Sequence, residues 1–160
     1  MEVEVDPDTG RTEIHNYVVI DDFGVVLNPM LLDGQVHGGI AQGVGQALFE
    51  RVVHDRQTGQ LLSGTLLDYA IPRADSLCAF TVHTANIPCT TNPLGIKGAG
   101  ESGTIAATPA VANAVIDALR REYGIAHVDI PLTPERVWQA IQNTRQSASD
   151  GQGSLTEGMT

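Results

Sequence analysis

The sequence predicts an α+β fold, in which β-hairpins and short strands pack against about three helices. Two observations support this prediction. Stretches in which apolar and polar residues alternate lie between turn sequences, as is typical of strands. Longer stretches place apolar residues three and four positions apart, as is typical of amphipathic helices. A chain of 160 residues with 42% hydrophobic residues is the size of one ordinary domain and can bury a core.

The N-terminal segment predicts a β-hairpin. Val3 and Val5 alternate with acidic residues, and residues 6–10 (Asp-Pro-Asp-Thr-Gly) form a strong turn sequence. Residues 12–20 then return as the second strand.

A long, glycine-rich helix is predicted over residues 29–53, because Asn28 precedes a proline at the first helical position and apolar residues recur at helical spacing. Each glycine inside a helix costs roughly 0.5–1 kcal/mol relative to alanine, so five glycines need a tertiary reason. A stripe that includes Gly34, Gly38 and Gln42 can face a ligand, or it can mark a close crossing with another helix. Both interpretations remain open at this point.

The middle of the chain predicts a second hairpin over residues 54–62 and a strand over residues 78–84. Residues 104–123 predict a helix whose regular part starts near Thr108 as its N-cap and which Gly124 ends.

The C-terminal part predicts a short strand at 128–130 and a last helix with Thr133 as N-cap and Pro134 at its first position. Beyond it the residues are small and polar. We therefore divide the chain into a folded region, residues 1–145, and a polar, disordered tail, residues 146–160.

Composition excludes several classes of partner. The formal net charge of −10 argues against nucleic acid and anionic membranes, which both require clustered Lys and Arg. No apolar run is long enough to span a membrane, and the N-terminus is acidic where a signal peptide is basic. Cys78 and Cys89 lie apart and no cluster has metal-ligand spacing, so we expect reduced thiols, a cytoplasmic protein and no metal ligated by side chains.

The segment most indicative of chemistry is residues 92–103, Asn-Pro-Leu-Gly-Ile-Lys-Gly-Ala-Gly-Glu-Ser-Gly. It carries one carboxylate, Glu101, among glycines that allow another group to approach the main chain closely. Lys97 is the single lysine of the sequence. A carboxylate on a tight loop before a helix can act as a catalytic base, or it can only stabilise the first turn of that helix. These residues by themselves leave both interpretations open.

Four segments together resemble the C-terminal part of the molybdopterin-binding large subunit in the xanthine dehydrogenase, aldehyde oxidase and carbon monoxide dehydrogenase family. The similarity covers nearly the whole chain except the polar tail. The segments are residues 27–30 (Leu-Asn-Pro-Met), 34–45 (Gly-Gln-Val-His-Gly-Gly-Ile-Ala-Gln-Gly-Val-Gly), 67–73 (Leu-Asp-Tyr-Ala-Ile-Pro-Arg) and 92–101 (Asn-Pro-Leu-Gly-Ile-Lys-Gly-Ala-Gly-Glu).

The resemblance implies roles for particular residues. Glu101 matches the family's active-site glutamate, the base that takes a proton from a molybdenum-bound hydroxyl. Gln42 matches a glutamine that reaches the pterin cofactor. The glycines beside these two residues are then expected to contact the cofactor; they are Gly38, Gly39, Gly43, Gly98 and Gly100.

The resemblance also implies cofactors and partners. They are molybdopterin, with or without an added cytosine nucleotide, together with iron–sulfur clusters and FAD on partner subunits. The reaction is hydroxylation by water of a small substrate: an aldehyde, an N-heterocycle or carbon monoxide. A family large subunit is several times longer than this chain, so the remaining large-subunit polypeptide is an expected partner. The alternative is a truncated, non-catalytic module without molybdenum chemistry.

Overall fold

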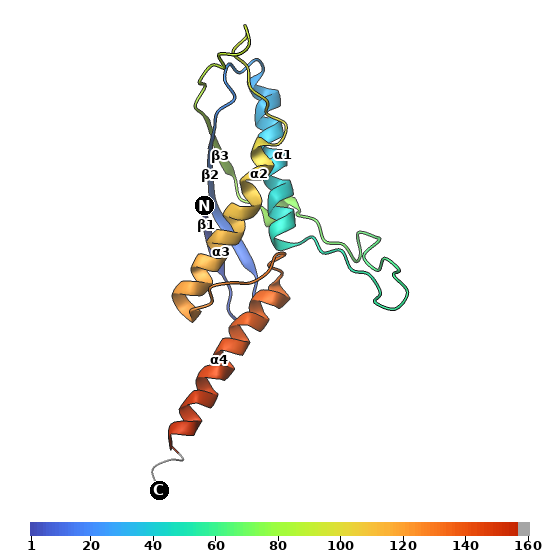
Figure 1. Cartoon of the computed structure of the whole chain (residues 1–160), viewed down its shortest axis with the longest axis vertical. Coiled ribbons are helices and arrows are strands. Elements are labelled where there is room, and N and C mark those ends of the chain that lie inside the picture. The colour runs from blue at the N-terminus through green and yellow to red at the C-terminus, as the bar shows by residue number, and fades with distance from the viewer. Residues whose placement is uncertain (157–160) are drawn as a thin grey trace.

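The computed structural model describes residues 1–156. It has an elongated body in which two long helices lie beside a small sheet, while one loop and the last helix extend away from that body (Figure 1). The predicted α+β class is confirmed. The elements are β1 (Glu2–Val5), β2 (Thr12–Asp21), α1 (Pro29–Leu48), a 3₁₀ turn (Ala74–Ser76), β3 (Phe80–Thr84), α2 (Ser102–Ile105), α3 (Ala107–Tyr123) and α4 (Pro134–Thr156).

The sheet has the order β1-β2-β3. The predicted hairpin is confirmed, because β1 and β2 pair antiparallel with Val5 opposite Thr12. β3 pairs parallel with β2, with Tyr17 opposite Phe80. Their rings meet edge to face with centroids 5.4 Å apart, a favourable aromatic geometry. Local sequence predicted β3 as a strand but did not predict its parallel pairing with β2. A parallel pair requires a long crossover connection between the two strands.

The core lies between the sheet and the helices. α1 and α3 each bury one apolar face, as their spacing predicts, and the start of α4 closes one end of the core. The largest fully buried members of these faces are Val36, Ile40 and Val44 of α1, Val111, Val115 and Leu119 of α3, and Val137 and Ile141 of α4.

Helix α1 begins as predicted and ends early. The Asn28 side chain accepts a hydrogen bond from the amide of Leu31 at 3.1 Å, which caps the helix. The prediction that the helix reaches Val53 is wrong, because the helix ends at Leu48. The carbonyl of Ala47 instead accepts a hydrogen bond from the amide of Leu132 at 2.6 Å. In a longer helix, the carbonyl of Ala47 would accept a hydrogen bond from the amide four residues further along. Here the amide of a segment more than eighty residues away forms the hydrogen bond to that carbonyl instead.

An extended arm, residues 50–73, follows α1 and projects from the body (Figure 1). The predicted hairpin at 54–62 is reduced to one bridge between His54 and Leu61 around the expected turn. The Tyr69 hydroxyl donates to the carboxylate of Glu50 at 2.6 Å and joins the two ends of the arm. The arm is therefore an ordered loop with little secondary structure.

The helix predicted over residues 104–123 is divided in two. α2 ends at Ile105 and α3 starts at Ala107, with Ala106 between them. The prediction of Thr108 as N-cap is wrong, because its hydroxyl contacts α1 and Ala106 is the capping residue. Gly124 ends α3 with φ of 71°, as predicted.

Three predictions for the C-terminal part need correction. Residues 128–130 form no strand. Pro134 opens α4 as predicted, but the Thr133 hydroxyl is buried without a hydrogen-bond partner and does not cap the helix. α4 continues to Thr156, through most of the expected disordered tail. Once nucleated, a helix adds one hydrogen bond per residue, and no proline follows Pro134 to stop it. Residues 157–160 lie outside the described residues.

In the part of the chain that the structure describes, no helix is both long and apolar enough to cross a membrane.

Candidate active site

The glycine-rich loop of residues 92–100 is attached to the segment that follows β2. Both ends of the Asn92 amide bond the backbone of Ile96, which closes a local turn. The amide of Lys97 donates to the carbonyl of Phe23 at 3.0 Å, and the amide of Val25 donates to Gly95 at 2.9 Å. The loop that leads to Glu101 is therefore held by main-chain bonds.

Asp22 connects three segments beside this loop. One carboxylate oxygen accepts hydrogen bonds from the amides of Gly24 and Ile87, each at 3.0 Å. The other oxygen accepts from Nζ of Lys97. The Lys97 ammonium, followed by the amide of Gly24, holds the pKa of the Asp22 carboxyl below its ordinary value.

The neighbouring Asp21 is in the opposite situation. One of its carboxylate oxygens is buried without a hydrogen-bond partner in the described structure. Burial raises its pKa above the ordinary value, because desolvation disfavours the charged form. Two adjacent aspartates thus have pKa shifts of opposite sign.

This contrast predicts opposite effects of two substitutions on the melting temperature of the full chain. Because the folded pKa of Asp21 is raised, ionisation costs stability as pH rises above the ordinary carboxyl pKa of 3.8. Asp21→Asn is expected to raise the melting temperature at pH 7 but not at pH 3. Because the folded pKa of Asp22 is lowered, its stabilisation exists above the ordinary pKa and is lost on acidification.

Asp22→Asn, the matched control, is therefore expected to lower the melting temperature at pH 7. Thermal unfolding followed by circular dichroism at both pH values measures these effects. A lower melting temperature for Asp21→Asn at pH 7 would contradict the argument.

Glu101 is exposed at the N-cap position of α2. Its backbone carbonyl accepts hydrogen bonds from the amides of Thr104 and Ile105, both at 3.0 Å. Its side chain makes no capping hydrogen bond, so the carboxylate does not close the helix start. In the part of the chain whose side chains the structure describes, the carboxylate has no hydrogen bond or ion pair, which leaves it free for another group.

Helix α1 contacts the segment after Glu101 through a repeated set of polar contacts. The Thr104 hydroxyl lies 3.0 Å from the carbonyl of Gly39 and 3.3 Å from Oε1 of Gln42. One turn later, Thr108 makes the same two contacts with Gly43 and Gln46, at 3.2 and 3.1 Å. The predicted residues Gln42 and Glu101 are thus brought to one place by Thr104.

Sequence reasoning selected neither threonine as part of the site, and it predicted Thr108 only as a helix cap. The available signal was their four-residue spacing, which matches the spacing of Gly39 and Gly43 and of Gln42 and Gln46 across the crossing.

The glycines predicted to bind the cofactor fall into two groups. At Gly39 an added Cβ would lie 2.9 Å from the amide nitrogen of Thr104, and at Gly43 it would overlap Cβ of Ala107. These two glycines therefore let α2 and the start of α3 cross α1 closely, which is the packing alternative. At Gly38, Gly98 and Gly100 an added Cβ would meet nothing within 4 Å.

Gly38 lies between Gln35 and Gln42 on one face of α1, because these positions are three and four residues apart. Gln35 donates a hydrogen bond from Nε2 to the carbonyl of Gly100 at 2.7 Å, and Gln42 contacts Thr104. Gly38 is thus on the face of α1 that makes these two contacts, and an added Cβ there would meet no atom within 4 Å. One face of α1 thus presents an uncovered backbone and two amide side chains to the segment that carries Glu101.

A groove of about 380 Å³ adjoins this place, between the start of α1 and the glycine-rich loop. Its walls are mainly apolar, and Gln35, Lys97 and Gly100 bring polar atoms to one side. The groove gives the site an apolar neighbourhood of the kind that small-molecule sites use.

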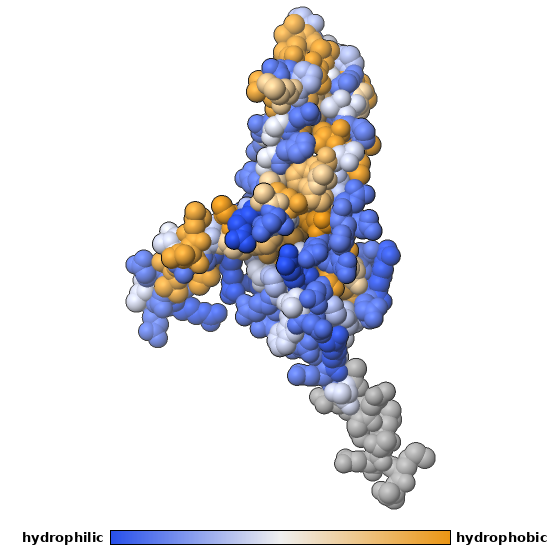
Figure 2. Space-filling model, turned by 180° about the vertical axis from the view of Figure 1, so that it is seen from behind, coloured by the Kyte–Doolittle hydropathy of each residue, from blue (hydrophilic) through white to orange (hydrophobic). Residues whose placement is uncertain are grey.

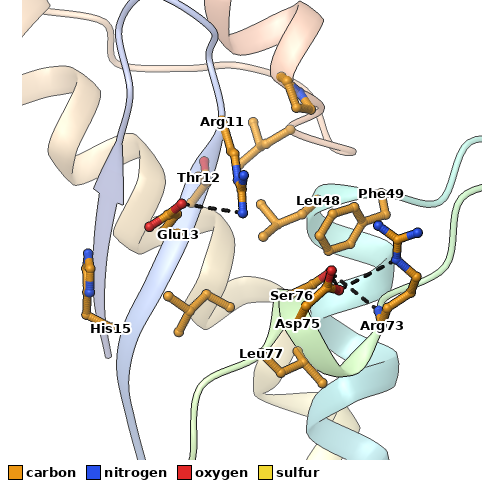
Figure 3. A pocket seen from close by; sticks show the side chains of 13 residues that line it. Arg11, Thr12, Glu13, His15, Leu48, Phe49, Arg73, Asp75, Ser76 and Leu77 are labelled. Atoms are coloured by element: carbon orange, nitrogen blue, oxygen red, sulfur yellow. Dashed lines mark hydrogen bonds and ion pairs between the residues drawn. The ribbon is translucent and has the colours of Figure 1, made fainter.

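A second cavity, of about 390 Å³, lies at the opposite end of α1 (Figure 3). Arg11 faces Glu13 at 3.4 Å and Arg73 faces Asp75 at 3.5 Å, so its charges are paired within the chain. Leu48 lines this cavity, and it is thirteen residues, or about 20 Å of helix, from Gln35. The cavity is therefore separate from the Glu101 site.

Comparison with known proteins gives consistent matches. The sequence model described as "Molybdopterin cofactor-binding domain" matches residues 1–78. The chain is 40% identical to the nicotine 6-hydroxylase large subunit of Paenarthrobacter nicotinovorans over 140 residues, which are 88% of this chain and 17% of that protein. It is 35% identical to the carbon monoxide dehydrogenase large chain of Hydrogenophaga pseudoflava, with the same coverage.

The structural comparison agrees. Quinoline 2-oxidoreductase from Pseudomonas putida 86 superposes with a TM-score of 0.83 and 41% identity, over 88% of this chain and 18% of the other. The chain thus spans under a fifth of the length of these relatives. It belongs to the family of molybdopterin-binding large subunits that includes xanthine dehydrogenase, aldehyde oxidoreductase and carbon monoxide dehydrogenase, and it corresponds to one part of such a subunit.

Proposed function

We propose that this chain supplies one wall of the molybdopterin site in a molybdenum hydroxylase and carries its catalytic base, Glu101. The environment of the Glu101 carboxylate is the observation that supports its role as base most directly. The carboxylate is exposed, has no partner among the side chains that the structure describes, and belongs to the segment that Gln35 and Gln42 of α1 contact at Gly100 and Thr104.

The residues present fit the cofactor. Gly38, Gly98 and Gly100 leave backbone uncovered, and the Gln42 amide can donate to and accept from a pterin edge. Gly39 and Gly43 support the site from behind by letting α2 approach α1. In this proposal the molybdenum is held by the pterin.

The proposed reaction adds the oxygen of water to a substrate carbon. A C–H bond and a water molecule become a C–OH bond, two protons and two electrons. The bound cofactor supplies the two-electron oxidation, and iron–sulfur clusters and FAD on partner subunits carry the electrons away. Glu101 accepts a proton from the attacking oxygen. A base in this place contributes typically about 10²- to 10⁴-fold to a rate.

The exposed apolar side chains of this chain support the proposal that another polypeptide covers part of its surface. Leu67 of the arm is 97% exposed, Met30 at the start of α1 is 76% exposed and Ile105 of α2 is 70% exposed. Apolar side chains gather on the arm and on the end of the body near the glycine-rich loop (Figure 2). Large exposed apolar patches are rare on monomeric proteins and mark interaction sites. We propose that the remainder of the large subunit covers them.

N-heterocycles are the first substrates to test, with aldehydes and carbon monoxide as the other candidates. The relatives at 40% and 41% identity are named for nicotine and quinoline, both N-heterocycles. The apolar groove beside Glu101 suits a flat, apolar ring.

Molybdenum content tests the proposal. The chain is purified alone and after coexpression with the remaining large-subunit polypeptide and the iron–sulfur and FAD subunits. We expect no molybdenum in the isolated chain and about one molybdenum per chain in the complex, because this chain holds only part of the site. Absence of molybdenum from an assembled complex would favour the truncated, non-catalytic module instead.

A further inference from the structure

Gln35 holds the peptide that precedes Glu101. Its Nε2 donates to the carbonyl of Gly100 at 2.7 Å, across 65 positions of sequence. Gly100 is the residue directly before Glu101, so this bond fixes the plane of the peptide that joins them. Among the side chains that the structure describes, no other makes a hydrogen bond to that peptide.

The loop needs such a contact. The previous anchor is Lys97, whose amide and ammonium bond Phe23 and Asp22. Gly98 and Gly100 lie between that anchor and Glu101. An added Cβ would meet no atom within 4 Å at either glycine, and glycine leaves the backbone the widest choice of angles. Between the two glycines, Ala99 packs partly buried against the core, and the Gln35 bond adds a polar contact at the end of the stretch next to Glu101.

On the other side of Glu101, contacts to its carbonyl and to Gly103 hold the chain. Its carbonyl accepts from the amides of Thr104 and Ile105. Gly103 lies against the backbone of Val36, where an added Cβ would be 2.5 Å from the Val36 carbonyl oxygen. Gln35 and Val36 are neighbours on α1, so one turn of that helix touches the chain on both sides of Glu101.

We infer that Gln35 is a positioning residue that directs the Glu101 carboxylate by holding the Gly100 carbonyl. The inference rests on the proposed role of Glu101 as base. Gln35 acts only through the backbone, so its loss moves the base without changing its charge. Misplacing a reacting group by about 1 Å can cost roughly 100-fold in rate.

The test compares Gln35→Ala with Gln46→Ala in the assembled complex. Gln46 is a matched control, because it is an exposed glutamine of the same helix that bonds a hydroxyl facing α1, at 3.1 Å. It lies eleven residues further along, or about 16 Å. Gln35→Glu is a second variant that keeps the length of the side chain and removes the N–H donor.

The expected result is a fall of about 10- to 100-fold in kcat per bound molybdenum for both Gln35 variants. KM, molybdenum content and melting temperature should stay within the range of Gln46→Ala. For Gln35→Ala, the acidic limb of the pH profile of kcat/KM should keep its midpoint. The substitution removes a neutral side chain that bonds a backbone carbonyl, so the charges around the base do not change. Normal kcat per molybdenum in both variants would overturn the inference, as would an equal loss in Gln46→Ala.

Amide hydrogen exchange in the full 160-residue chain gives a readout that does not require turnover. We expect the amides of Thr104 and Ile105 to exchange about fivefold faster in Gln35→Ala, as for the loss of one ordinary hydrogen bond. The amides of α3 serve as the internal reference. Unchanged exchange at these two positions would overturn the inference even if the variant complex failed to assemble.

The same complexes separate this inference from the proposed function. If Glu101→Gln retains full turnover, the proposed base is wrong and the role of Gln35 falls with it. If Glu101→Gln is inactive while both Gln35 variants are fully active, only the positioning role is wrong.

Discussion

Glu101→Gln in the assembled complex is expected to lower kcat by about 10²- to 10⁴-fold, the contribution typical of a general base. Glutamine keeps the length and shape of the side chain but cannot accept the proton. The carboxylate makes no capping bond in the folded chain. The substitution is therefore expected to leave the melting temperature and the molybdenum content unchanged. Steady-state turnover per bound molybdenum, with nicotine or quinoline as first substrates, measures the effect.

Glu122→Gln is the matched control, because Glu122 is an exposed glutamate on α3, away from the site. It should retain full turnover. Full activity of Glu101→Gln at normal molybdenum content would contradict the proposed base. Loss of molybdenum from Glu101→Gln would instead assign Glu101 to cofactor binding.

Gly39→Ala is expected to destabilise the full chain, while Gly38→Ala is expected to stabilise it. Both positions lie inside α1. Alanine loses less backbone freedom on folding than glycine does, so each substitution by itself stabilises the folded chain by about 0.5–1 kcal/mol. At Gly39 the new methyl group would also lie 2.9 Å from the Thr104 amide nitrogen and 3.0 Å from two backbone atoms of Gly103. Such overpacking costs typically about 1–3 kcal/mol.

The two substitutions control each other, since they share residue type, helix and propensity gain. Chemical unfolding of the two variants and of the unmodified chain gives the difference in the free energy of unfolding. A Gly39→Ala variant as stable as Gly38→Ala would contradict the close crossing of α1 and α2.

The same pair also bears on the cofactor. In the complex, the Gly38 backbone is proposed to face the pterin, so Gly38→Ala is expected to lower molybdenum retention although it stabilises the isolated chain. Retention unchanged in this variant would remove Gly38 from the proposed cofactor contacts.

Local signals predicted several elements correctly. The first hairpin followed from alternation around a Pro-Asp-Thr-Gly turn, and the start of α1 followed from Asn28 and Pro29. These signals succeed because a turn or cap is decided by residues within a few positions of each other. Thr133 shows their limit: a capping residue by type, it has a buried hydroxyl without a hydrogen-bond partner.

Contacts between distant segments account for the main errors. The end of α1 depends on Leu132, which takes the carbonyl of Ala47. The parallel pairing of β2 with β3 depends on how the chain crosses between them. Periodicity cannot reveal either, because both partners lie far away in sequence.

The sequence by itself determined the fold class, the family and the residue types available for the site, because turn residues, spacing and motifs are local properties of the chain. Only the tertiary structure decided what each glycine does. Gly38 and Gly39 are adjacent and chemically identical, yet one faces open space and the other faces the backbone of residues 103 and 104. A glycine has no side chain to indicate its partner, so its role depends on what lies opposite, and the packing of α2 on α1 sets that.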